Sequence, residues 1–260
     1  MTSTTTGHTT LVGWLLQRAD SDLVLAHRLC EWVGKGPVLE EDIATTNVGL
    51  DLLGQARLWY AYAGDVERAT TGTGRSEDEL AFRRDTHAFR NLLLVEQPNG
   101  SYADTIARQF LFDRWHLLLL DGLTGSADAR VAEIAAKAVK EVAYHAERST
   151  DWVIRLGDGT DESHAKMQAA IDDLWMYTGE MFTADPIELE LIEANVAADA
   201  RGLAAPWREH VEEVLRAATL QIPEDAFMQQ GGKRGVHTEH LGHLLSEMQV
   251  LPRSHPGARW

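Results

Sequence analysis

The sequence is poor in cysteine and proline: its 260 residues include one cysteine, Cys30, and seven prolines. A single thiol excludes an internal disulfide and is typical of a reducing compartment, so we expect a cytoplasmic protein. With so little proline, long helices can run without interruption, and no stretch alternates apolar and polar residues as an exposed strand does. These absences predict an all-α protein.

Long apolar runs and an excess of basic residues are absent too. No window approaches about 18 uninterrupted apolar residues, so we expect no membrane-spanning helix. Lysine and arginine total 24 against 40 acidic residues, for a formal net charge of −16. Because phosphate binding needs a basic surface, this balance excludes nucleic acid and suits a partner with a basic patch.

The first residues resemble no targeting segment. Residues 1–9 (MTSTTTGHT) have neither the basic start nor the apolar core of a signal peptide, and we expect a disordered lead there. Residues 10–260 are long enough to bury one large core, and we expect them to form a single helical domain.

The stretch from Val131 to Leu156 predicts one long helix. Its apolar and small residues recur at spacings of three and four, which places a set of side chains on one face: Val131, Ala135, Ala138, Val142, His145, Ser149, Trp152 and Leu156. A histidine on such a face needs a partner for each ring nitrogen. In ferritin-like di-metal proteins this position belongs to a Glu-x-x-His pair that holds metal. Here Val142 stands where the glutamate would be.

Three more long helices are predicted over residues 10–33, 39–64 and 102–121, the last with a capping box formed by Ser101 and Asp104. Each carries one acid on a mostly apolar face: Asp22, Asp51 and Asp113. For Asp22 the alternative is a helix break at residues 20–22 with an N-cap, and a lone aspartate on such a face is more often an edge residue than a ligand. Three acids together with His145 nevertheless favour an inward polar site.

In the second of these helices a single predicted inner face holds Ile43, Asn47, Leu50, Gly54, Leu58 and Ala61. Asp51 and Gly54 have the spacing of a Glu-x-x-His pair, but a glycine cannot ligate a metal. We therefore interpret Gly54 as a site of close helix packing.

A di-metal carboxylate site needs one glutamate from each of two helices and a Glu-x-x-His pair from each of the other two. The inward set Asp22, Asp51, Asp113 and His145 supplies at most four ligands, with one histidine instead of two. We therefore predict no metal ligands, no cofactor site and no catalytic residues in this chain. Buried acids without metal need counter-charges, and His145 and Arg18 are candidates for a network that fixes helix register.

Further helices are predicted over residues 79–95, 161–182, 187–194, 206–220 and 239–250, the last capped by Thr238 and ended by Pro252. Before it, residues 229–235 (QQGGKRG) predict an exposed basic loop. The spacing of the neighbouring histidines does not fit a zinc site, so capping and interface roles are favoured. The predicted partner-binding residues are Lys233, Arg234, His237, Glu239 and His240. The alternative is a mobile loop with two solvated cations.

Long segments also carry a resemblance to a known family. They are Arg28 to Ala44, Asn47 to Arg57 (NVGLDLLGQAR), Asn91 to Phe110, Lys140 to His145, Gly157 to Phe182, and Gly231 to Gln249 (GGKRGVHTEHLGHLLSEMQ). Together they cover nearly the whole chain after residue 20. On these segments the chain resembles the C subunits of the bacterial phenylacetyl-CoA ring 1,2-epoxidases, which are ferritin-like proteins of phenylacetate catabolism.

The resemblance implies a ferritin-like four-helix bundle with additional helices, mainly C-terminal. It implies a non-catalytic structural subunit in a multicomponent, NADPH-dependent monooxygenase. In such an enzyme the paralogous catalytic A subunit holds the di-iron site and binds the CoA thioester, a small B subunit joins the complex, and a reductase supplies electrons. Against the pattern of the catalytic paralogue, Asp22 and Asp51 stand at glutamate positions, Gly54 at a histidine and Val142 at a glutamate.

Two alternatives remain open at this point. A free-standing ferritin-like di-metal oxygenase would need two intact Glu-x-x-His pairs, and neither is intact. A generic helical scaffold would not co-purify with an oxygenase. We also expect the chain to associate with a second copy of itself or with a different subunit.

Overall fold

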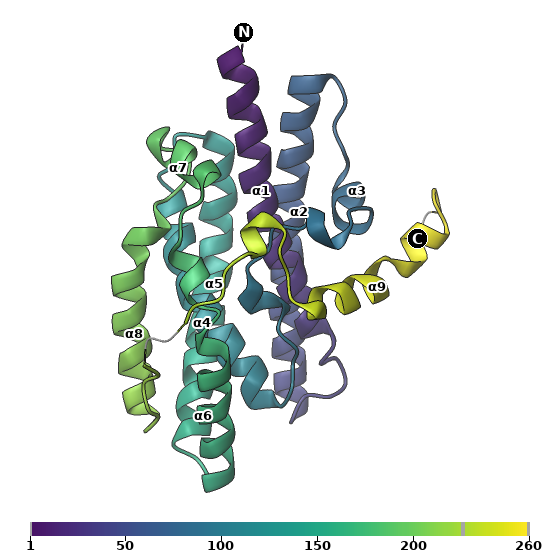
Figure 1. Ribbon diagram of the computed structural model, residues 1–260. Coiled ribbons are helices and arrows are strands. Elements are labelled where there is room, and N and C mark those ends of the chain that lie inside the picture. The colour runs from purple at the N-terminus through teal and green to yellow at the C-terminus, as the bar shows by residue number, and fades with distance from the viewer. Residues whose placement is uncertain (1, 225–226, 259–260) are drawn as a thin grey trace.

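The computed structural model describes residues 2–224 and 227–258, and these residues form helices, short 3-10 turns and loops, with no strand among them. The fold class, an all-α ferritin-like bundle with extra helices that are mainly C-terminal, is confirmed (Figure 1). The α-helices are α1 (Thr2–Cys30), α2 (Leu39–Thr71), α3 (Glu77–Phe82), α4 (Tyr102–Leu123), α5 (Ala129–Gly157), α6 (Asp161–Trp175), α7 (Pro186–Glu193), α8 (Ala204–Ala217) and α9 (Glu239–Ser254).

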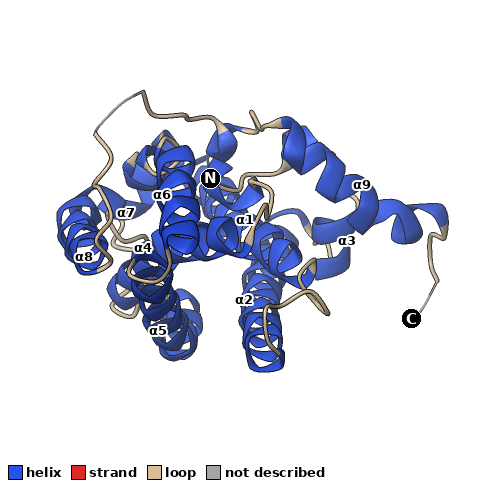
Figure 2. Cartoon of the chain, turned by 90° about the horizontal axis from the view of Figure 1, so that it is seen from below, coloured by secondary structure: helices blue, strands red, loops and turns tan. Residues whose placement is uncertain are grey.

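The bundle is made of two tightly packed helix pairs, α1 with α2 and α4 with α5. Helices α6 and α8 pack on α4 and α5, α7 packs on α1, and α9 projects from the side of the molecule beside α3 (Figures 1 and 2). Helix α4 is buried on most of its sides, since α5, α6 and α8 surround it. Large aromatic rings fill the centre, among them Trp14, Trp59, Phe110 and Trp115.

Several predicted helix boundaries differ from the structure. Helix α1 begins at Thr2 instead of following a disordered lead at residues 1–9, of which Met1 lies outside the described residues. It runs through residues 20–22 without a break, so the alternative N-cap there is wrong. Helix α2 extends past Gly64 to Thr71, whereas the capping box of Ser101 and Asp104 is confirmed. Among the described residues no helix is long and apolar enough to cross a membrane.

The predicted helix over residues 79–95 is wrong beyond Phe82, where the chain becomes irregular apart from two 3-10 turns, Thr86–Ala88 and Leu93–Glu96. The reason is a set of long-range hydrogen bonds from α1. Asp20 is fully buried, pairs with the Arg84 guanidinium (Nη1–Oδ2 3.0 Å) and accepts the backbone N–H of Arg90 at 2.7 Å. These bonds replace the i to i−4 bonds that a helix would supply.

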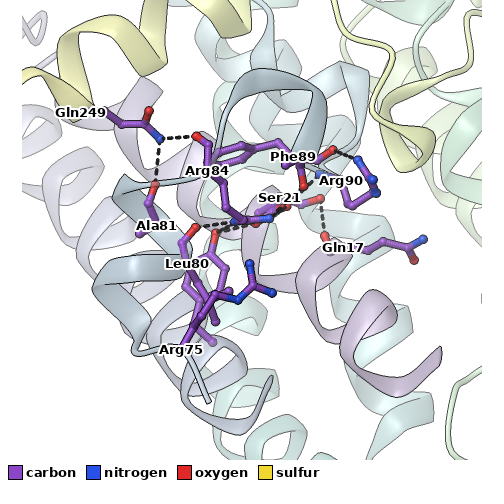
Figure 3. Close-up of polar contacts among 12 residues, drawn as sticks. Gln17, Ser21, Arg75, Leu80, Ala81, Arg84, Phe89, Arg90 and Gln249 are labelled. Atoms are coloured by element: carbon purple, nitrogen blue, oxygen red, sulfur yellow. Dashed lines mark hydrogen bonds and ion pairs between the residues drawn. The ribbon is translucent and has the colours of Figure 1, made fainter. Parts of the chain in front are cut away.

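Helix α9 is tied to the same irregular segment. The Gln249 side chain donates to the carbonyl oxygens of Ala81 and Arg84, both at 3.1 Å (Figure 3). Arg253, one residue after Pro252, also donates to the Arg84 carbonyl. The helix therefore continues to Ser254 rather than ending at Pro252.

The segment 228–238, here called the strap, crosses the bundle between η3 (Gly179–Phe182) and α9. Its backbone N–H groups are bound by buried carboxylates: Glu180 accepts from Gly231 at 2.9 Å, and Glu96 accepts from Thr238 at 2.6 Å. Helix α6 ends at Trp175 rather than Phe182, and the 3-10 turn that follows presents Glu180 to the strap. The strap thus replaces the exposed loop predicted at residues 229–235.

We expect Gly232→Ala to lower the free energy of unfolding by about 2–3 kcal/mol, because a Cβ at this position would overlap the carbonyl oxygen of Asn91. Gly242→Ala is the matched control. Nothing lies within 4 Å of a Cβ there, so this change in α9 should stabilise the protein by about 0.5–1 kcal/mol. Urea denaturation of both variants measures the difference in free energy of unfolding. Equal changes in the two variants would show that the strap does not pack closely against Asn91.

Candidate functional site

The residues predicted to form an inward polar site come one each from α1, α2, α4 and α5. His145, Asp113 and Asp22 are buried, while the side chain of Asp51 is 39% exposed at the edge of the bundle. The nearest contact in the set joins His145 Nε2 and Asp51 Oδ2 at 3.0 Å. This bond connects α5 with α2 and gives one nitrogen of the buried imidazole a partner.

Asp113 has its own hydrogen bonds rather than a direct bond to His145. The Ser149 hydroxyl donates to Oδ2 at 2.9 Å, and the Gln109 amide donates to Oδ1 at 2.5 Å. Burial raises the pKa of Asp113 to about 6, although His145 and these two hydrogen bonds act in the opposite direction. The carboxyl group therefore titrates close to neutral pH.

The sequence analysis missed His116, which completes the site. It follows Asp113 by three residues on α4, so the Asp-x-x-His spacing was a signal that could have identified it. His116 Nε2 lies 3.7 Å from Asp22 Oδ1. Burial lowers the pKa of His116 to about 3 and raises the pKa of Asp22 well above its usual value. Burial therefore disfavours the charged form of both groups, so the contact is not a strong ion pair.

Arg18 was a candidate counter-charge for Asp22, and its charge does oppose the rise in the pKa of that carboxyl, but its ion pair is with Glu188, with Arg18 Nη2 and Glu188 Oε1 3.6 Å apart. Its guanidinium lies over the rings of Trp14 and Trp115. Asp22 also accepts a hydrogen bond from the Trp59 side chain on α2. The four predicted residues therefore lie in one region of the bundle, but they do not form a single hydrogen-bond network. Asp51 bonds to His145, whereas Asp22 and Asp113 each contact other side chains.

The residues present do not fit a di-metal centre. Val142 is apolar and fully buried, and Asp51 and Asp113 already accept hydrogen bonds from neighbouring side chains. No group of three or more His, Cys, Asp or Glu side chains within residues 2–224 and 227–258 could hold a metal ion. The predicted close packing at Gly54 is also wrong, because nothing lies within 4 Å of a Cβ placed there.

The predicted partner-binding residues are only partly on the surface. Lys233 is buried, with its Nζ 2.8 Å from Glu188 Oε2. The His237 ring is also buried and lies 3.0 Å from both Glu96 Oε2 and the Phe89 carbonyl.

These two residues therefore hold the strap inside the molecule. Arg234 on the strap and Glu239 on α9 are exposed, and His240 is half-buried at the start of α9. The strap glycines, which we interpreted as allowing another chain to approach, bring the strap against this chain's own residues 87–93. Partner binding by Arg234, Glu239 and His240 stays a prediction.

Asp113→Asn should stabilise the protein more at about pH 7.5 than at about pH 4.5. The folded-state pKa of about 6 exceeds the usual value of 3.8, so the folded protein binds the proton more tightly and loses stability as pH rises through this window. About two pKa units correspond to roughly 3 kcal/mol at pH 7.5, and about 1 kcal/mol of this is already present at pH 4.5, so the two pH values should differ by about 2 kcal/mol. Chemical denaturation at both pH values measures the difference, and the same effect at each pH would contradict the shift.

His145→Leu should lower the free energy of unfolding by about 1–2 kcal/mol. This is less than the roughly 3–5 kcal/mol expected for a fully buried pair, because water can reach the Asp51 carboxylate that loses its partner. A double-mutant cycle with Asp51→Ala isolates the interaction. Strictly additive losses would show that the two side chains do not stabilise each other.

The chain is similar to known proteins over nearly its whole length. The family described as "Phenylacetic acid catabolic protein" matches residues 1–260. The C subunit of the 1,2-phenylacetyl-CoA epoxidase of Escherichia coli (strain K12) is 50% identical over 250 residues, which is 96% of this chain and 99% of that protein. Both findings extend over the bundle, the strap and α9, and the chain belongs to the phenylacetic acid catabolic protein family.

Proposed function

We propose that the chain is a structural, non-catalytic subunit of a phenylacetyl-CoA epoxidase. The observation that supports it is the state of the inward site in a chain so similar to one component of that enzyme. Val142 offers no ligand atom and Gly54 no side chain, and the remaining carboxylates and histidines bond to one another or to neighbouring side chains. The bundle is kept while the side chains that would hold metal are replaced.

The proposal includes partners that perform the chemistry. A paralogous catalytic subunit would hold the di-iron site, a small third subunit would join the complex, and a reductase would deliver electrons from NADPH in the cytoplasm. In this arrangement the present chain supports its catalytic paralogue through direct contact. Its net charge of −16 suits partners with basic patches.

The test uses the purified chain alone and after co-expression with the catalytic paralogue. Iron analysis after anaerobic loading should find no stoichiometric iron in the isolated chain, and iron and epoxidase activity should appear only in the complex. About two irons per isolated chain, lost in His145→Ala, would instead establish a di-metal protein and end the structural proposal. His243→Ala, which changes an exposed histidine on α9, controls for nonspecific iron binding.

A further inference from the structure

Helix α2 has a second apolar face that the chain itself leaves uncovered. The sequence predicts Ile43 and Leu50 on an inner face, but the structure turns that face outward and leaves these side chains 52% and 55% exposed. Leu39 and Leu53 are 70% and 42% exposed on the same helix. The face that packs on α1 is a different one and carries Val48, Leu52, Ala56, Trp59 and Ala63.

Next to this face lies a hollow of about 200 Å³ between α2 and α5. Figure 2 shows α2 and α5, the helices that line it, projecting on the same side of the bundle. The lining residues are Leu50, Asp51, Gly54, Gln55, Leu58, Lys137, Ala138 and Glu141. On α5 the row continues to Tyr144, whose side chain is half exposed. We call the hollow and the exposed row on α2 the α2/α5 groove.

Gly54 leaves open space in the groove. A glycine within a helix is less favourable than alanine, so it usually reflects a close approach of other atoms. Within this chain nothing lies within 4 Å of a Cβ at Gly54. The space in front of Gly54 is thus available to an atom of another chain.

The charges along the rim favour one kind of neighbour. Lys137 and Lys140 are exposed on successive turns of α5, and neither has an ion pair with any described residue. A second copy of this chain would bring another −16 of net charge against the first, which disfavours self-association. Asp51 and Glu141 also line the hollow, so a matching chain would present an uncharged ridge over the hollow and the row on α2, and would place carboxylates only at the two lysines.

We propose that the α2/α5 groove seats a helix of the catalytic sister subunit, with a small-residue or apolar ridge against Gly54 and carboxylates at Lys137 and Lys140. This inference rests on the proposed function and identifies the surface through which the chain would bind its sister subunit. The same helix would cover Asp51, whose carboxylate lines the hollow and binds His145.

The experiment co-expresses the chain with its catalytic sister, purifies the pair and measures the dissociation constant. Gly54→Leu and Leu50→Asp should each weaken binding at least about tenfold, because one fills the hollow and the other places a charge in an apolar contact. Each has a matched control on α9. Gly242→Leu is one, since a Cβ there also meets nothing within 4 Å, and Leu251→Asp is the other, since it replaces a leucine that is 55% exposed, as Leu50 is.

The double variant Lys137→Glu/Lys140→Glu should weaken binding most at low salt, since screening reduces the contribution of rim charges. Thermal melts of each isolated variant establish that it folds, and the substitutions in the groove all lie at exposed positions.

The outcomes separate the inference from the proposed function. If the wild-type chain bound its sister and the groove variants bound equally well, the groove would be excluded as the binding surface, and the proposed function would be unaffected. If the wild-type chain did not bind its sister, the proposed function itself would be wrong. If the isolated chain formed dimers that Leu50→Asp dissociated, the occupant would be a second copy and the inference would be overturned.

Discussion

A buried carboxylate must receive hydrogen-bond donors, because a buried charge without them costs several kcal/mol. In this structure Asp20, Glu96 and Glu180 are buried, and each accepts a backbone N–H from a segment that is not helical: Arg90, Thr238 and Gly231, respectively. The requirement acts in both directions. The acids are stable only where these segments lie, and the segments obtain from the acids the bonds that helices would otherwise supply. The irregular chain around residue 90 and the strap are therefore as firmly part of the interior as the long helices.

The inward site obeys the same constraint with fewer charges. Asp51 and His145 join α2 to α5, Asp113 and Ser149 join α4 to α5, and Asp22 meets residues of α2 and α4. Burial disfavours the charged forms of both Asp22 and His116, so this contact depends less on charge than the contacts of Asp20 do. The polar residues of the inward site thus act as contacts between helices.

The long helices could be predicted because a three-and-four spacing of apolar residues depends only on nearby residues, and α5 follows that spacing closely. The same spacing identifies which residues share a face but not what that face contacts, so the outer face of α2 was assigned to the interior. The segment after Phe82 has helical residue types, but its conformation depends on Asp20, more than sixty positions earlier. His116 was overlooked although its spacing from Asp113 was visible, because the expected pattern required a glutamate. Lys233 shows the opposite error: its charge suggested a surface site, yet Glu188 makes it an interior residue.

The α2/α5 groove and the inward site meet at Asp51. Its carboxylate is 39% exposed because it lines the hollow, and the same carboxylate binds the fully buried His145. Water in the hollow weakens the electrostatic part of that bond, since the interaction of two polar groups falls as the surrounding dielectric rises. A chain seated over the groove would remove this water and strengthen the contact between α2 and α5, which pack far less closely than α1 with α2 or α4 with α5. Covering the apolar row and strengthening the inward contacts would then be consequences of the same event, and Asp51 would be the residue that couples them.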